Sequence, residues 1–120
     1  MIENIIMTLN DVLKIPVLPE YPEINSSTLE PKKFVVFEIV DRQKNDFIDA
    51  VTIEFNSYAE SKYEAAMIDK NVRHAVEDLI ENDQISSIEF GGGSSGDRHD
   101  EEMKKYRYRC YYNFYFYEEE

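Results

Sequence analysis

The stretch that decides the fold is VTIEFN, Val51 to Asn56, in which apolar and polar residues alternate. Val51, Ile53 and Phe55 fall on one side of an extended chain, and the polar residues between them fall on the other. This period of two predicts a β-strand with one buried and one solvated face. Because such a sheet needs a second layer over its apolar face, the rest of the sequence has to supply that layer.

The run before this strand, Phe34 to Val40, is β-branched and aromatic, with Glu38 as its one charged residue. It predicts a strand that is buried on much of both faces, followed by a turn at Asp41 to Asp46. The short polar separation from Val51 favours an antiparallel hairpin. Further upstream, residues 15–33 hold all four prolines of the chain. We expect an extended connection there, with at most short edge strands.

Two helices are predicted to form the covering layer. The first carries an apolar stripe with spacings of three and four and ends before Pro16; the stripe comprises Ile2, Ile5, Ile6, Leu9, Val12 and Leu13. The second starts at Ser61-Lys62-Tyr63-Glu64, which matches the capping box of a helix N-terminus. Its stripe comprises Ala65, Ile68, Val72, Ala75 or Val76, and Leu79. Each stripe can be buried against a sheet.

Two further strands are expected after the second helix. Ile85, Ile88 and Phe90 suggest one of them. The last strand, Tyr106 to Tyr117, holds six of the nine tyrosines and is aromatic on both faces. Its core face is predicted to carry Tyr106, Tyr108, Cys110, Tyr112, Phe114 and Phe116. Because arginine and tyrosine are enriched at protein interfaces, the opposite face predicts an oligomer interface made by Arg107, Arg109, Tyr111, Tyr115 and Tyr117.

The order of these elements predicts one domain over residues 1–120 with an α+β fold. Two helices would pack on one face of a mainly antiparallel sheet of four to five strands. The other face of the sheet would then be left for solvent or for a partner. No internal repeat is evident.

All four glycines of the chain lie between Gly91 and Gly96, so a flexible loop is expected at about residues 91–105. A docking role is predicted for its first part, which consists of Gly91, Gly92, Gly93, Ser94, Ser95, Gly96, Asp97, Arg98, His99 and Asp100. The segment is not a phosphate-binding P-loop, because it lacks the Lys-Ser/Thr pair and the helix that must follow.

No residue constellation predicts catalysis, a cofactor or a metal site. His74 and His99 are far apart in the chain, and the cluster around His99 adjoins the glycine-rich segment rather than a rigid support. Cys110, the single cysteine, falls in phase with core residues, which predicts a buried and inert thiol. A lone cysteine also excludes an intramolecular disulfide.

The acidic net charge of the chain limits the kinds of partner that it can bind. With 25 acidic and 13 basic residues, the formal net charge is -12. This charge argues against tight binding of nucleic acid or of anionic lipid, both of which need a basic surface. Nine tyrosines and seven phenylalanines nevertheless predict a folded chain. No stretch approaches the roughly 20 apolar residues of a membrane span, and residues 1–13 lack the pattern of a signal peptide, so no membrane partner is expected.

The whole-chain pattern resembles the tail terminator, or tail completion, family of long-tailed bacteriophages, whose members are also described as minor tail or head–tail joining proteins. The resemblance spans nearly all 120 residues. It rests on the first helix, the proline-containing excursion, the strand at 34–40, and the stretch Ala50 to Ala59 that leads into the capped helix with its paired Ala65 and Ala66. A further strand, a variable loop and the terminal strand complete the pattern.

This resemblance implies a structural protein of the virion and not an enzyme. Such a protein forms a ring, commonly a hexamer, that caps the tail tube. The implied partners are further copies of the chain, the tail tube protein, and the head connector or head completion protein, with DNA only as transiting cargo. The implied location is the virion tail, after assembly in the bacterial cytoplasm. The alternative is a small acidic binding protein, an inhibitor or a DNA mimic, that acts as a monomer or dimer.

Overall fold

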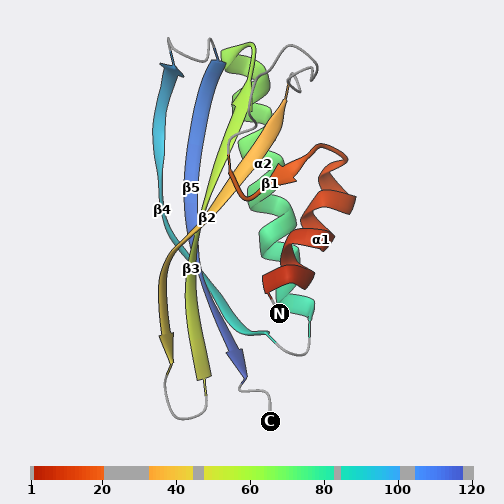
Figure 1. Cartoon of the computed structure of the whole chain (residues 1–120), viewed down its shortest axis with the longest axis vertical. Coiled ribbons are helices and arrows are strands. Elements are labelled where there is room, and N and C mark those ends of the chain that lie inside the picture. The colour runs from red at the N-terminus through yellow and green to blue at the C-terminus, as the bar shows by residue number, and fades with distance from the viewer. Residues whose placement is uncertain (1, 21–32, 45–47, 83–84, 101–104, 118–120) are drawn as a thin grey trace.

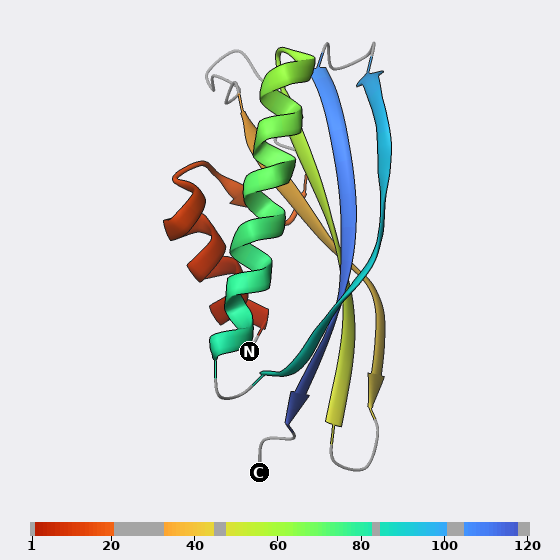
Figure 2. The same cartoon turned by 180° about the vertical axis from the view of Figure 1, so that it is seen from behind.

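The computed structural model describes residues 2–20, 33–44, 48–82, 85–100 and 105–117. The elements in chain order are α1 (Ile2–Leu13), β1 (Val17–Leu18), β2 (Phe34–Lys44), β3 (Ile48–Ala59), α2 (Lys62–Asp78), the 3-10 turn η1 (Leu79–Glu81), β4 (Ile85–Asp100) and β5 (Lys105–Tyr117). The five strands form one sheet in the order β1-β2-β3-β5-β4. Every pairing is antiparallel except that of β1 with β2. Both helices lie on one side of the sheet (Figures 1 and 2), which confirms the predicted α+β architecture.

Helix α2 packs directly on the sheet. The Ser61 side chain accepts a hydrogen bond of 3.1 Å from the backbone N–H of Glu64, so the predicted N-cap is present. The predicted stripe is buried throughout; it consists of Ala65, Ile68, Val72, Ala75, Val76 and Leu79. This face contacts β3 and β5, the two central strands.

Helix α1 packs on α2 and on β1 rather than on the middle of the sheet. It ends at Leu13, because Lys14 adopts a left-handed backbone conformation with a φ of 58° and its N–H closes the last turn on the Asn10 carbonyl at 3.1 Å. The chain then enters β1, where the Val35 N–H donates a 2.9 Å hydrogen bond to the Pro16 carbonyl. The expected short edge strand is therefore present, and residues 21–32 of the expected connection lie outside the described residues.

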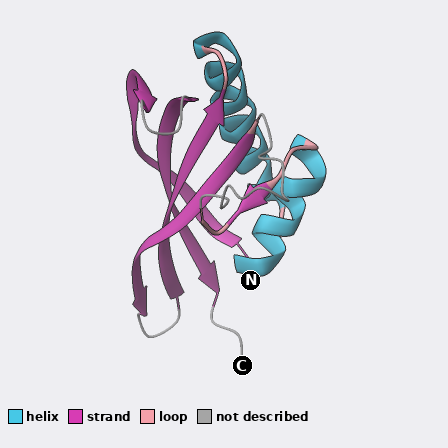
Figure 3. Cartoon of the chain, turned by 45° about the horizontal axis from the view of Figure 1, so that its top comes forward, coloured by secondary structure: helices cyan, strands magenta, loops and turns pink. Residues whose placement is uncertain are grey.

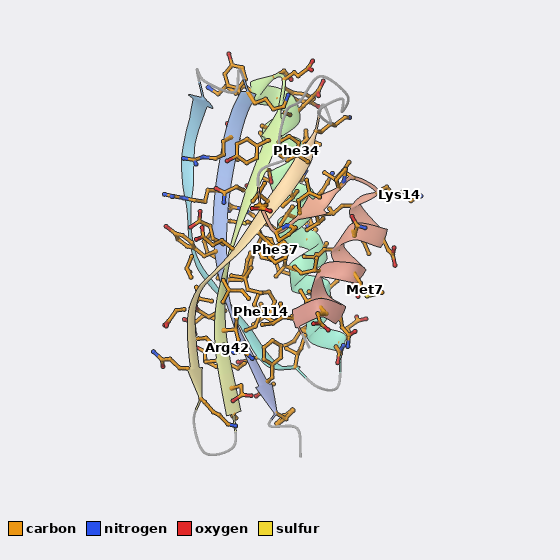
Figure 4. The ribbon with its side chains drawn as sticks, viewed as in Figure 1. Met7, Lys14, Phe34, Phe37, Arg42 and Phe114 are labelled. Atoms are coloured by element: carbon orange, nitrogen blue, oxygen red, sulfur yellow. The ribbon has the colours of Figure 1, made fainter. Side chains whose placement is uncertain are left out.

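The core fills the layer between helices and sheet. Ile5 and Leu9 of α1 join the stripe of α2 and the inward side chains of β3 and β5, among them Ile53 and Phe114. Figure 4 shows Phe37 and Phe114 in this layer, and Met7, which is exposed, on the far side of α1. Val51, Ile53 and Phe55 are buried, so the face predicted from the alternation in Val51 to Asn56 is confirmed.

Strand β2 differs from its prediction in two ways. It continues to Lys44, because residues 41–44 pair with residues 49–52 of β3, so the turn expected at Asp41 is wrong for these residues. Asn45 and Asp46 lie outside the described part of the chain. The expectation of burial on both faces is also wrong: Phe34 and Val35 are buried, whereas Ile39 and Val40 are exposed. Burial on both faces would need a layer over each face, and β2 packs mainly on β3 and β1 within the sheet.

The flexible loop expected from Gly91 is wrong for residues 91–100, which belong to β4 and pair with β5. Glycine and serine composition suggested a loop, but β5 provides a neighbouring strand of 13 residues for this segment. The irregular sequence is accommodated by register shifts at Phe90/Gly92 and Ser94/Arg98. Residues 101–104 lie outside the described residues.

Candidate functional site

The candidate site is the face of the sheet that no described helix covers. Figure 3 shows both helices on the opposite side of the twisted sheet. From Cys110 onward the predicted alternation along β5 is confirmed: Cys110, Tyr112, Phe114 and Phe116 are buried, and the residues between them are half-buried or exposed. Tyr106 and Tyr108, also predicted for the core face, are only half-buried and pack against the core. The open face of β5 therefore presents the residues predicted as an interface, which are Arg107, Arg109, Tyr111, Tyr115 and Tyr117. Tyr117 is the most exposed of them, at 56%.

Glu54 of β3 organises the centre of this face. Its Oε1 atom accepts a 3.0 Å hydrogen bond from the Asn56 side-chain amide and lies 3.9 Å from Nη1 of Arg109. The guanidinium carbon of Arg109 lies 5.7 Å from the centre of the Tyr111 ring. Arg109 is thus held between a carboxylate and an aromatic ring, with its charge directed along the sheet surface. This ion pair is long and partly exposed, so its role is to orient the guanidinium more than to stabilise the fold.

A cross-strand hydrogen bond extends this polar row. Thr52 and Asn113 are direct partners in the β3–β5 ladder. The Thr52 hydroxyl donates to the Asn113 side-chain oxygen at 2.6 Å. Cross-strand pairs of this kind fix neighbouring side chains on one face of a sheet. The open face is therefore an ordered surface of aromatic, cationic and amide groups.

The predicted docking residues lie beside this surface. Gly92 pairs with Tyr111, and Gly93 pairs with Cys110, so the glycines lie on the edge strand next to the aromatic row. Gly92 has a φ of +125°, a conformation that favours glycine. Ser94 to Asp100 continue the same strand, but their side chains lie outside the described part of the structure. The two predicted sets of site residues are therefore neighbours in the sheet, although the second is not a loop over 91–100.

The thiol of Cys110 shows no sign of activation. Cys110 is fully buried, as predicted, and burial together with the nearby Asp69 charge raises the pKa of its thiol to about 12. A thiol with such a pKa stays protonated at neutral pH and is a poor nucleophile.

His74, one of the two histidines of the chain, lies on α2 with its side chain exposed.

A buried charge that was not predicted from the sequence lies at the helix–sheet boundary. Asp69 is 6% exposed and forms a 2.9 Å ion pair with Arg73, which is four residues later in α2. Burial raises the pKa of the Asp69 carboxyl, and the Arg73 charge offsets this only in part. The spacing of Asp69 and Arg73 indicates a helical ion pair. The available signal was that Asp69 lies four residues after Ala65 and three before Val72, a spacing that places it next to the buried stripe.

The described residues contain no group of three or more His, Cys, Asp or Glu side chains placed to bind a metal ion. Among the helices that the structure describes, neither combines the length and the apolar character needed to cross a membrane. Comparison with models of known protein families and with curated proteins found no match.

Proposed function

We propose that the protein is a structural subunit of the tail terminator type, which forms a ring on the end of a phage tail tube and joins it to the head connector. The proposal includes no catalysis. The observation that supports it most is the ordered arginine–tyrosine surface on the open face of β5, opposite the two helices. The resemblance described above supplies the biological setting.

The open face has the composition of an interface. Tyrosine and arginine contribute strongly to binding, because each combines a large apolar body with polar groups. On β5 they occupy most open-face positions of a strand of 13 residues within a molecule 47 Å long, so the surface can contact a neighbouring subunit over several strands. A ring needs two different surfaces on each subunit, because its contacts are heterologous. We assign this face to one of the two.

The charge of the protein fits passage of DNA better than binding of DNA. The net charge of -12 would repel phosphate groups, and a ring of such subunits would multiply that charge. We propose that DNA crosses the ring as cargo. An assembled ring with a basic inner wall would contradict this part of the proposal.

The oligomeric state tests the proposed function. Light scattering after size exclusion should reveal a species with about six times the 14.2 kDa chain mass, and negative-stain images should show rings. Because some rings close only on their template, the experiment should be repeated with purified tail tubes that lack a terminator. A protein that stays monomeric or dimeric under both conditions would favour the alternative, a small acidic binding protein. Binding of the isolated protein to nucleic-acid-binding proteins would then be the next measurement.

A further inference from the structure

Arg73 of α2 reaches the edge strand of the sheet. Its Nε atom lies 2.9 Å from Oδ2 of Asp69, and its guanidinium carbon lies 5.0 Å from the centre of the Phe90 ring. A Cβ atom at Gly93 would lie 2.6 Å from an Nη atom of Arg73, so the guanidinium fills the place of a side chain there. Arg73 thus contacts β4 on both sides of the bulge at Gly91. We call Asp69, Arg73, Phe90 and Gly93 the Arg73 clasp.

The two halves of β4 are attached to the molecule in different ways. In the first half, Ile85 is buried in the core and Ile88 packs against it. The second half begins with Gly91, Gly92 and Gly93, which have no side chains to pack, and the last of the three register shifts in β4 follows between Ser94 and Arg98. Because β4 is the edge of the sheet, β5 is the only one of the described strands that pairs with its backbone. Arg73 therefore attaches this half to α2 at Gly93.

Cys110 lies beneath the clasp. It is the direct ladder partner of Gly93 and is fully buried. Because Arg73 also closes over Gly93, the guanidinium, Gly93 and Cys110 are neighbours at this point of the sheet. A reagent can reach this sulfur only if the strand or the helix above it moves. The single cysteine of the chain is thus a built-in reporter for the clasp.

We propose that the Arg73 clasp is a latch on the edge strand: it holds β4 from Gly91 to Asp100 against α2 and β5, and its release lets this half separate while the remaining fold stays intact. Opening of this kind is local, because the buried stripe of α2 and the first half of β4 do not take part in it. It uncovers Cys110 and the backbone edge of β5. The inference is independent of the proposed ring.

Thiol labelling tests the latch directly. The full-length protein is treated with a maleimide at pH 7.5, and modification of Cys110 is followed by mass spectrometry. We expect Arg73→Gln to raise the labelling rate about tenfold, because the loss of both the ion pair and the cation–π contact favours the open form. The rate should depend weakly on low urea concentrations, since local opening exposes little surface. Amide hydrogen exchange should speed up at residues 91–100 and not at residues 85–90.

Lys70→Gln is the matched control, because it makes the same charge change at an exposed position one turn away on α2. It should label within about twofold of the unmodified protein. If Arg73→Gln does not fold, Arg73→Lys keeps the charge, loses the planar guanidinium and should label faster than the unmodified protein. An unchanged rate in the folded Arg73 variant overturns the latch. A labelling rate that follows urea with the full slope of global unfolding also overturns it.

Discussion

Thr52 and Asn113 face each other across the two central strands, and the Thr52 hydroxyl donates a 2.6 Å hydrogen bond to the Asn113 side-chain oxygen. This bond lies on the open face, where it ties β3 to β5 independently of the core. Thr52→Val keeps the shape and the strand preference of the side chain but leaves the Asn113 oxygen without this donor. We expect the free energy of unfolding in urea to fall by about 1 kcal/mol. Thr52→Ser, which keeps the hydroxyl, should lose less, and an equal loss would show that the bond contributes little.

Lys14 ends α1 in a left-handed conformation that costs a non-glycine residue energy. The side chain is exposed, so Lys14→Gly removes the steric cost without removing a buried contact. We expect the free energy of unfolding to rise by about 0.5–1 kcal/mol. Lys14→Val, which is β-branched, should lower it, and thermal or urea unfolding would measure both changes. Opposite signs for the two variants are the distinguishing result.

The buried Cys110 thiol predicts a loss of stability in alkali. Its pKa rises from 9.0 to about 12 in the folded protein, so between these values the unfolded chain has lost a proton that the folded chain retains. The contribution of this thiol to the free energy of unfolding is therefore fully present below pH 9 and is lost as the pH rises towards 12. Cys110→Ala removes this contribution, so its unfolding free energy should depend less steeply on pH. Parallel curves for the two proteins above pH 9 would contradict the assignment.

The tyrosines on the open face of β5 should matter more for assembly than for folding. Tyr111→Ala, Tyr115→Ala and Tyr117→Ala are expected to lower the fraction of oligomer in light scattering about tenfold or more, with a small change in monomer stability. Tyr117 is the best single site, because its side chain is already 56% exposed. Tyr63→Ala is the matched control: Tyr63 is 73% exposed but lies on α2, at the other side of the molecule. An equal effect of Tyr63→Ala would show that the interface lies elsewhere.

The elements with a clear period were predictable from the sequence. The alternation in Val51 to Asn56 and the stripe from Ala65 to Leu79 each determine which side chains can be buried together, so both faces were assigned correctly. The same holds for β5, where the aromatic residues of the predicted core face include Tyr112 and Phe114, both buried. Local pattern was sufficient in these cases because burial follows the period of the element itself.

Features that depend on a neighbouring strand were not predictable in this way. Asp41 to Lys44 and Gly91 to Asp100 have the composition of turns, and they are strands because β3 and β5 offer them backbone partners. The clasp was missed for a similar reason. From the sequence, Asp69 and Arg73 are spaced as an ordinary helical ion pair. Their contact with Phe90 and Gly93 depends on the packing of α2 against β4, which the sequence pattern does not predict.

The strand order also constrains how the molecule can be made. β5 pairs with β3 on one side and with β4 on the other, so it joins the hairpin of β2 and β3 to the rest of the sheet. During translation, β2, β3 and then α2 emerge before β5 has been synthesised. Until then, β3 lacks one of its two neighbouring strands, and its apolar face is only partly covered. The contacts between β3 and β5 span about 50 to 70 residues of chain, a separation that slows folding. The sheet and its core can therefore be completed only after β5 has been synthesised, because β5 joins the β2–β3 hairpin to β4.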